Sequence, residues 1–242
     1  WLLAFSRGLF EVSKNYKCEL LGGDTIKHKS SCNFFSVTAL GYLEGERVLK
    51  RNGMQLGDDI WVSGDLGEPI TALQLQKESK KLLQPVPKVA LGLKIREFAT
   101  SSIDLSDGLS SDLRHLILAS FLGNSDKIFV ELYFEEMLKC LSQNMVNWFA
   151  GKNDNLELVM LALQSGDEYE LCFSAPVNAR TKIRDIGKNL NLPLTLIGSV
   201  RERSNEKNFH WATNRNDGLV WLKSLTNIFD DIFVEKSGYV HF

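Results

Sequence analysis

The sequence predicts a layered fold of strands and helices, of the α/β or α+β class. Segments rich in β-branched and aromatic residues alternate with segments whose apolar residues recur every three or four positions. The chain has 242 residues, 44% of them hydrophobic and 24% charged, which is enough to bury a sizeable core in one large or two modest domains. The same composition excludes the disordered, collagen-like and coiled-coil classes.

One helix and two short strands are expected in the first part of the chain. Apolar residues between Trp1 and about Lys17 recur at spacings of three and four, which predicts a helix packed on one face. Residues 18–21 and 34–43 are expected to be strands, the second because it is rich in β-branched and aromatic residues. A polar connection with several glycines, residues 45–59, follows and is the candidate domain boundary.

Beyond this connection, strands and helices alternate. A strand at 60–63 is followed by a loop at 64–68 that contains Gly64 and Gly67. Pro69 suits the first turn of the helix that comes after this loop. A strand, a glycine loop and a helix in this order are typical of a phosphate cradle. The other expected elements are a helix at 88–99, a helix beginning at Leu109, a strand at 127–134, a helix at 156–163, a strand at 168–173, a helix at 182–190 and a strand at 192–200.

Charge and cysteine usage argue against several function classes. The 28 Lys and Arg residues against 30 Asp and Glu leave no basic excess for a nucleic-acid backbone, so no nucleic-acid partner is expected. The longest nearly apolar run, residues 116–122, is too short to cross a bilayer, and the start of the chain lacks an export signal. We therefore expect no membrane partner and a cytoplasmic location. The four cysteines and four histidines show no zinc-binding spacing, which favours buried free thiols.

Carboxylates stand beside glycines in three short segments at predicted strand ends. Mg²⁺ is usually held by one or two carboxylates together with substrate phosphates, so separated acidic residues of this kind suit it. Asp104 and Asp107 are three positions apart at a helix start, where backbone N–H groups can bind an anion. The alternative is ordinary capping, with Asp104 or Ser106 as the N-cap, and on this motif alone capping is favoured. The segments are Gly22-Gly23-Asp24-Thr25, Asp104-Leu105-Ser106-Asp107-Gly108 and Gly166-Asp167-Glu168-Tyr169-Glu170.

The sequence leaves two possible roles for each of several other polar and aromatic residues. Gly22 to Asp24 could equally form a plain turn or a functional loop. The basic pair Lys50 and Arg51 is ordinarily a solvated pair, although a guanidinium can bind a phosphate in bidentate fashion. Aromatic residues of the last third, Tyr239 among them, could stack on a ring-shaped ligand, but core packing is their usual role.

In this order the motifs resemble the bacterial thiamine-monophosphate kinase family, and the resemblance covers nearly the whole chain. Each motif is common, but the combination is specific. The motifs are G-G-D-T from Gly22, R-x-G-x-x-x-G-D from Arg51, I-D-L-S-D-G from Ile103, G-D-E-Y-E-L from Gly166 and a terminal G-Y at Gly238.

This resemblance implies the fold of the aminoimidazole ribonucleotide synthetase-like superfamily of ATP-binding enzymes. Members have an amino-terminal α/β domain that dimerises and a carboxy-terminal α/β domain. Residues 1–50 would be the end of the first domain and residues 58–242 the second. The chain begins at Trp1 without an initiator Met, so we expect it to lack the family's opening segment, with further metal-binding aspartates and part of the substrate pocket.

The resemblance also implies roles for individual residues. Gly23, Asp24, Arg51 and Ser106 would bind ATP, Asp24, Asp104 and Asp107 would hold Mg²⁺, and Asp167 and Tyr239 would contact the substrate. The family usually has G-G-E-D-Y-E where this chain has S-G-D-E-Y-E, so one glycine is replaced and the acidic pair is inverted. Glu168 is therefore an alternative to Asp167 as the substrate contact.

The implied reaction is direct in-line transfer of the γ-phosphoryl group of ATP to thiamine monophosphate, which gives thiamine diphosphate as the last step of its biosynthesis. The acceptor is a phosphate oxygen that is already anionic near neutral pH, because the second phosphate pKa is about 6. No catalytic general base is expected; positioning and charge neutralisation would suffice.

Two alternatives remain. One is another ATP-using enzyme of the superfamily, although two of its branches need a reactive amino-terminal or a terminal cysteine, and this chain ends in Gly238-Tyr239-Val240-His241-Phe242. The other is a non-catalytic module that binds a nucleotide or a metal.

Overall fold

The structure is a computed structural model of the chain. It describes residues 1–27, 29, 31–43, 45, 47–123, 128–151, 154–202, 220–223 and 232–233. The chain divides into two compact units, Trp1–Tyr42 and Leu43–Phe242. The division into domains at 1–50 and 58–242 stays a prediction, since compactness does not define the domains of a family.

The first unit contains one helix, α1 (Leu2–Tyr16), which confirms the helix expected there. It ends at Lys17, whose backbone is left-handed with φ 53°. The rings of Phe5 and Phe35 stack with centroids 4.9 Å apart. The strands expected at 18–21 and 34–43 are wrong, because a strand needs a hydrogen-bonded neighbouring strand and neither segment joins a sheet within the described residues.

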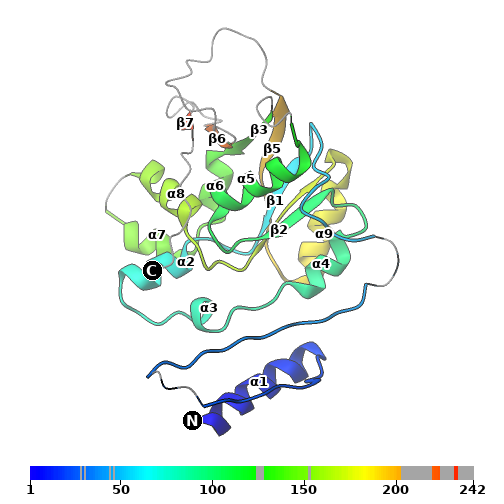
Figure 1. Cartoon of the computed structure of the whole chain (residues 1–242). Coiled ribbons are helices and arrows are strands. Elements are labelled where there is room, and N and C mark those ends of the chain that lie inside the picture. The colour runs from blue at the N-terminus through cyan, green and yellow to red at the C-terminus, as the bar shows by residue number, and fades with distance from the viewer. Residues whose placement is uncertain are drawn as a thin grey trace. The chain divides into compact units, whose positions relative to one another are not determined.

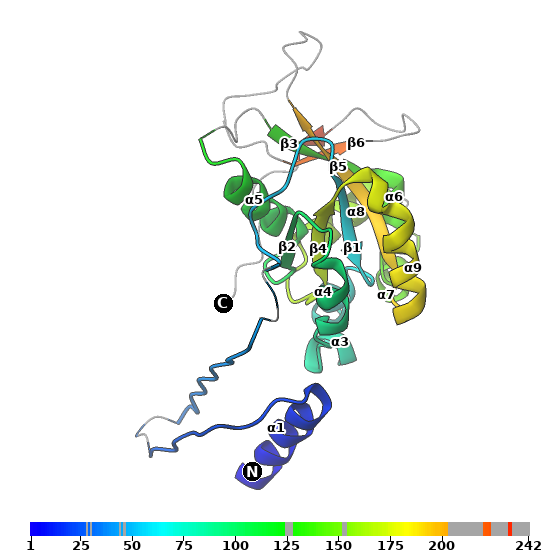
Figure 2. The ribbon, with the colours of Figure 1, turned by 90° about the vertical axis from the view of Figure 1, so that its right-hand side faces the viewer.

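A seven-stranded sheet forms the centre of the second unit, in the order β2-β4-β1-β5-β3-β6-β7 (Figures 1 and 2). The pairings are antiparallel except that β3 runs parallel to β6, so the α+β form of the expected class is the one observed. The strands are β1 (Asp59–Ser63), β2 (Ser101–Asp104), β3 (Ile128–Tyr133), β4 (Leu171–Ala175), β5 (Leu194–Glu202), β6 (Val220–Lys223) and β7 (Ile232–Phe233).

Helices connect the strands of this sheet. Those expected after Pro69, near Lys88, after Gly108 and at 156–163 and 182–190 are confirmed. Three short helices, α3, α6 and α7, were not expected. At four to seven residues they are too short to show periodicity, and, unlike α2, none has a proline in its first turn. The helices are α2 (Glu68–Gln74), α3 (Lys80–Leu83), α4 (Val89–Ile95), α5 (Leu109–Ser120), α6 (Phe134–Lys139), α7 (Gln143–Phe149), α8 (Asn155–Gln164) and α9 (Arg180–Leu190), with a 3-10 turn η2 (Val177–Ala179) before α9.

Both faces of the sheet are covered. Side chains alternate along β1, so Ile60 and Val62 point into one hydrophobic core and Trp61 into the other. The first core contains residues of α5, α6, α7 and α8, and the second contains residues of α4 and α9 (Figure 1). The sheet therefore lies between two helical layers, and the ends of β2 and β4 meet the helices of the first layer.

Two findings concern properties expected from composition. None of the helices in the described residues is long and apolar enough to span a membrane. All four cysteines are free thiols, but only Cys140 and Cys172 are buried, whereas Cys18 and Cys32 are exposed. The expectation of buried thiols is thus confirmed for half of the set and wrong for the two in the first unit.

Candidate active site

The candidate site begins at the turn between β2 and α5. Asp104 ends β2, and Gly108 is the N-cap of α5 with no side-chain capping bond. Instead, the Asp112 carboxylate in the first helical turn accepts the backbone N–H groups of Ser106 (3.1 Å) and Asp107 (3.2 Å). The capping interpretation of Asp104 and Ser106 is therefore wrong, since Gly108 and Asp112 shape this helix start.

The acidic segment before β4 runs alongside this turn. The N–H of Asp167 donates to the carbonyl of Ser106 (2.9 Å), and that of Tyr169 donates to the carbonyl of Leu105 (2.7 Å). Leu105 in return donates to the carbonyl of Glu170 (2.8 Å). Two motifs separated by about sixty residues in the sequence are thus joined by three backbone hydrogen bonds.

Electrostatics show that the acidic side chains share one region. Burial, a hydrogen bond to Asp167 (3.0 Å) and the charges of Asp167, Asp104 and Asp107 raise the pKa of Tyr169. Burial, together with the charges of Asp107 and Asp104, raises the pKa of Asp112 to about 6. The carboxylates of Asp104, Asp107 and Asp167 therefore create a negative field at this corner of the sheet, which favours a bound cation.

The donor set fits a magnesium ion that is shared with a phosphate. Within the part of the chain that the structure describes, no group of three or more His, Cys, Asp and Glu side chains could hold a metal alone. Mg²⁺ is commonly bound by one or two carboxylates, with substrate phosphates and waters completing its octahedron. Asp104 and Asp107 supply two hard oxygen donors of this kind beside the amino-terminal end of α5.

The loop after β1 is not the phosphate cradle that its glycines indicated. The N–H of Gly67 donates to the Glu168 carboxylate at 2.6 Å. A Cβ atom placed on Gly64 would lie 2.5 Å from the Glu170 carboxyl carbon, and one on Gly67 would overlap the Met145 side chain. The Gly67 amide and the space beside Gly64 are thus taken up by the protein's own carboxylates. Both glycines also have a positive φ, 65° at Gly64 and 87° at Gly67, which disfavours any other residue there.

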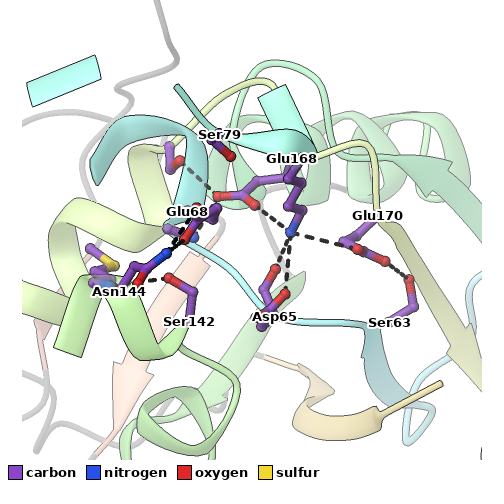
Figure 3. A network of polar contacts seen from close by, with 12 residues as sticks. Ser63, Asp65, Glu68, Ser79, Ser142, Asn144, Glu168 and Glu170 are labelled. Carbon is purple, nitrogen blue, oxygen red and sulfur yellow. Dashed lines mark hydrogen bonds and ion pairs between the residues drawn. The ribbon is translucent and has the colours of Figure 1, made fainter. Parts of the chain in front are cut away.

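An ion-pair network binds these carboxylates, and we call the set Lys81, Lys88, Glu168 and Glu170 the lysine–glutamate cluster. Lys81 Nζ lies 2.9 Å from Glu168 Oε2 and 3.5 Å from Glu170 Oε1, and Lys88 Nζ lies 3.0 Å from Glu170 Oε1. Figure 3 shows Asp65, from the loop after β1, converging with Glu168 and Glu170, which both come from the segment before β4. Burial would lower the pKa of Lys81, but the two glutamates outweigh it and raise that pKa. Lys81 is therefore charged at neutral pH.

Glu168 is consequently a structural residue and not a substitute substrate contact. Its side chain is 1% exposed, and its carboxylate also accepts the Ser165 hydroxyl at 2.7 Å. Asp167 is partly exposed and hydrogen-bonds the Tyr169 hydroxyl instead. Of the inverted acidic pair, only Asp167 is partly exposed, and Glu168 is buried.

The remaining predicted site residues belong to other segments of the chain. Gly23 and Asp24 belong to the first unit, where the Asp24 carboxylate accepts the N–H of Thr25 at 2.7 Å. The Arg51 carbonyl accepts the Ser120 hydroxyl at 3.5 Å, at the end of α5 opposite Asp107. With 12 residues in α5, this end is about 18 Å from the other. Tyr239 lies outside the described residues.

Sequence reasoning missed two residues that shape the site. Asp112 could have been found, since an acidic residue in the first turn of a helix commonly accepts backbone N–H groups there. Lys81 belongs to no motif, and its four-residue helix has no periodic pattern, so its pairing with Glu168, 87 residues further on, left no local signal.

The sequence was compared with protein-family models and with proteins of known function. No protein-family model matches the chain. Thiamine-monophosphate kinase of Buchnera aphidicola subsp. Schizaphis graminum is 31% identical over 255 residues, covering 100% of this chain and 69% of that protein. The enzyme of the same name from Haemophilus influenzae is 34% identical over 215 residues, covering 84% of this chain and 61% of that protein. The chain thus spans about two thirds of the length of these relatives.

Solved structures that resemble this chain include enzymes of the same name. The thiamine monophosphate kinase of Aquifex aeolicus superposes with a TM-score of 0.63 at 26% identity, covering 84% of this chain and 65% of that one. A structure described as AaThiL complexed with AMPPCP and TMP gives a TM-score of 0.67 at 24% identity, covering 100% of this chain and 68% of that one. Escherichia coli HypE, a hydrogenase maturation protein, shares the fold at a TM-score of 0.51 and 18% identity, covering 78% of this chain and 52% of that one.

The fold is therefore the aminoimidazole ribonucleotide synthetase-like fold. Such folds serve several ATP-using branches, and the relatives decide between them. The chain belongs to the thiamine-monophosphate kinase family.

Proposed function

We propose that the protein phosphorylates thiamine monophosphate with ATP and Mg²⁺, in the cytoplasm, and releases thiamine diphosphate and ADP. One observation carries this proposal more than any other. Backbone hydrogen bonds join the Asp104–Asp107 turn to the segment of Asp167, so a candidate metal site and a candidate substrate contact lie side by side. The names of the relatives and the AMPPCP and TMP bound by the AaThiL structure support the same reaction.

In this proposal the residues of the chain act by position and charge. Asp104 and Asp107 would hold Mg²⁺, which neutralises charge on the transferring phosphoryl group when it is bound. Ser106, at the start of α5, would contact ATP. Gly23, Asp24 and Arg51 would also bind the nucleotide, and Asp24 would be a further ligand of Mg²⁺. Asp167 would face the thiamine monophosphate.

No residue is assigned as a general base. The acceptor oxygen carries its own negative charge near neutral pH, so deprotonation adds nothing to its reactivity. Among the described residues of the site, the polar groups are carboxylates, a serine and a tyrosine. A phenol is already protonated near neutral pH, and burial raises the pKa of Tyr169 further. Alignment of acceptor and donor is then the main source of the rate.

Product analysis of the intact protein separates this proposal from its alternatives. Incubation with ATP, Mg²⁺ and thiamine monophosphate should yield thiamine diphosphate and ADP in equal amounts. An ATPase of another superfamily branch would release ADP without thiamine diphosphate, and a non-catalytic module would bind ATP without consuming it.

Tyr239 gives a test of the substrate pocket. If its ring packs on the thiamine heterocycle, Tyr239→Ala should raise the KM for thiamine monophosphate roughly five- to a hundredfold, by analogy with the about 1–3 kcal/mol of base–aromatic stacking. The KM for ATP should stay nearly constant. Steady-state kinetics beside a melting curve decide the matter: equal changes in both KM values, or a lower melting temperature with unchanged KM, would defeat the pocket assignment.

The quaternary structure provides a second prediction. We expect a homodimer, because family members dimerise through the amino-terminal domain and because the apolar side chains Phe34, Val37 and Leu40 are exposed in the first unit. Sedimentation at micromolar concentration should give twice the mass of the intact chain. A monomer under those conditions would refute the prediction.

A further inference from the structure

The segment Gly166–Glu170 carries two kinds of residue in alternation. Asp167 and Tyr169 are accessible to solvent. Glu168 and Glu170 are 2% and 3% exposed, and their carboxylates belong to the lysine–glutamate cluster. Each accessible residue is therefore flanked by a side chain that is fixed in the protein interior.

The accessible residues have a backbone conformation that L-amino acids avoid. Asp167 has φ 59° and Tyr169 has φ 50°, and neither is a glycine. Left-handed conformations of such residues cost conformational free energy and persist only where the surrounding structure holds them. Two of them at alternate positions need a strong external constraint.

Lys81 supplies that constraint from a different element. Its ammonium group contacts Glu168 and Glu170 and also donates to the backbone carbonyl of Asp65. Ser63 adds a hydroxyl that donates to Glu170 at 2.5 Å. Because both glutamates are buried, loss of this cation would leave a surplus of negative charge with no access to water.

We propose that Lys81 is a positioning residue: by holding Glu168 and Glu170, it fixes Asp167 and Tyr169 in their left-handed conformations beside Ser106. The consequence for substrate binding rests on the proposed function, in which Asp167 contacts thiamine monophosphate. The consequence for the backbone does not depend on the proposed function, since it concerns only how firmly residues 166–170 are held. Lys81 acts through the two glutamates and has no contact with the reacting groups in this account.

The test uses the intact protein and four variants. Lys81→Met removes the cation, and Lys81→Arg retains it. Lys81→Met combined with Glu168→Gln removes one charge of each sign. This double variant leaves no surplus buried charge, so the test still works if Lys81→Met alone fails to fold. Lys80→Met is the matched control, because Lys80 is the neighbouring, exposed lysine of the same helix.

Hydrogen exchange is the first measurement. In the double variant, the amides of Asp167 and Tyr169 should exchange at least tenfold faster, while the amides of β5 should keep the rate of the unmodified protein. Lys80→Met and Lys81→Arg should change neither region by more than about twofold. A purely structural role would accelerate both regions together, so equal acceleration, or no change at residues 167 and 169, would overturn the proposal.

Kinetics are the second measurement. The double variant should raise the KM for thiamine monophosphate at least tenfold, and Lys81→Arg should restore it to within about threefold of the original. Faster exchange with an unchanged KM would overturn the link to substrate binding. If the unmodified protein does not turn over thiamine monophosphate at all, the proposed function fails, while the exchange result still decides whether Lys81 positions the segment.

Discussion

Replacing Asp104 or Asp107 by asparagine is expected to lower Mg²⁺-dependent ATP turnover by roughly a hundredfold or more, the scale seen when one preorganised electrostatic contact is removed from an active site. Asparagine keeps the shape of aspartate but loses the charge that binds a hard cation. Neither carboxylate caps α5, so the protein should remain folded. Initial rates over a range of Mg²⁺ concentrations, beside melting curves, measure both effects.

The control for this pair is Asp185→Asn. Asp185 is an exposed residue of α9, in the helical layer that covers the other face of the sheet, and its charge should not matter for turnover. Full activity of Asp104→Asn and Asp107→Asn at saturating Mg²⁺ would remove both residues from the site. A loss of activity that parallels a loss of folded protein would show that they act through stability.

Gly108→Ala is expected to destabilise the protein by roughly 3 kcal/mol. Gly108 has φ 110° and ψ 145°, a conformation close to the region that only glycine populates freely, which costs another residue about 1–3 kcal/mol. A Cβ atom there would also lie 3.1 Å from the backbone carbonyl of Gln164, and overpacking of this kind adds about 1–3 kcal/mol. Urea unfolding measures the sum.

Gly123→Ala separates the two causes. Gly123 also has a positive φ, 79°, but a Cβ atom there would meet none of the described residues within 4 Å. Its replacement should cost only about 1–2 kcal/mol, from backbone strain alone. If both variants lose the same stability, the contact between Gly108 and α8 contributes nothing, and the close packing inferred at the helix start is wrong. Because Gly108 follows Asp107 directly, its variant should also lose ATP turnover, whereas Gly123→Ala should not.

The sequence was sufficient to predict those helices and strands in which the spacing of buried residues is visible within the element itself. The alternating or periodic residues of β3, α5, α8 and α9 were sufficient, since each of these elements shows one face to a core over several turns or residues. The strand expected at 34–43 failed because β-branched and aromatic residues favour a strand only where a neighbouring strand can pair with it. Composition within the segment carries no information about that partner.

The candidate site was likewise predictable where its residues form local motifs, and not where they depend on distant partners. Motifs identified the acidic turn at Asp104–Asp107 and the segment of Asp167, and the structure brings these two together. The glycine loop at 64–67 was misinterpreted, because the carboxylate that occupies the Gly67 amide comes from Glu168, 101 residues away in the sequence. Lys81 was missed for the same reason: its partners are distant, and a single lysine in a polar stretch has no pattern of its own.

Transfer of label from the γ-phosphoryl group of ATP to thiamine monophosphate tests the central claim most directly. The intact protein would be incubated with thiamine monophosphate, Mg²⁺ and ATP labelled in the γ-phosphoryl group, and the products would be separated and counted. The account predicts that label appears in thiamine diphosphate in a one-to-one ratio with the ADP formed, and that omission of Mg²⁺ stops the transfer. Label released as inorganic phosphate, with no labelled thiamine diphosphate, would contradict it.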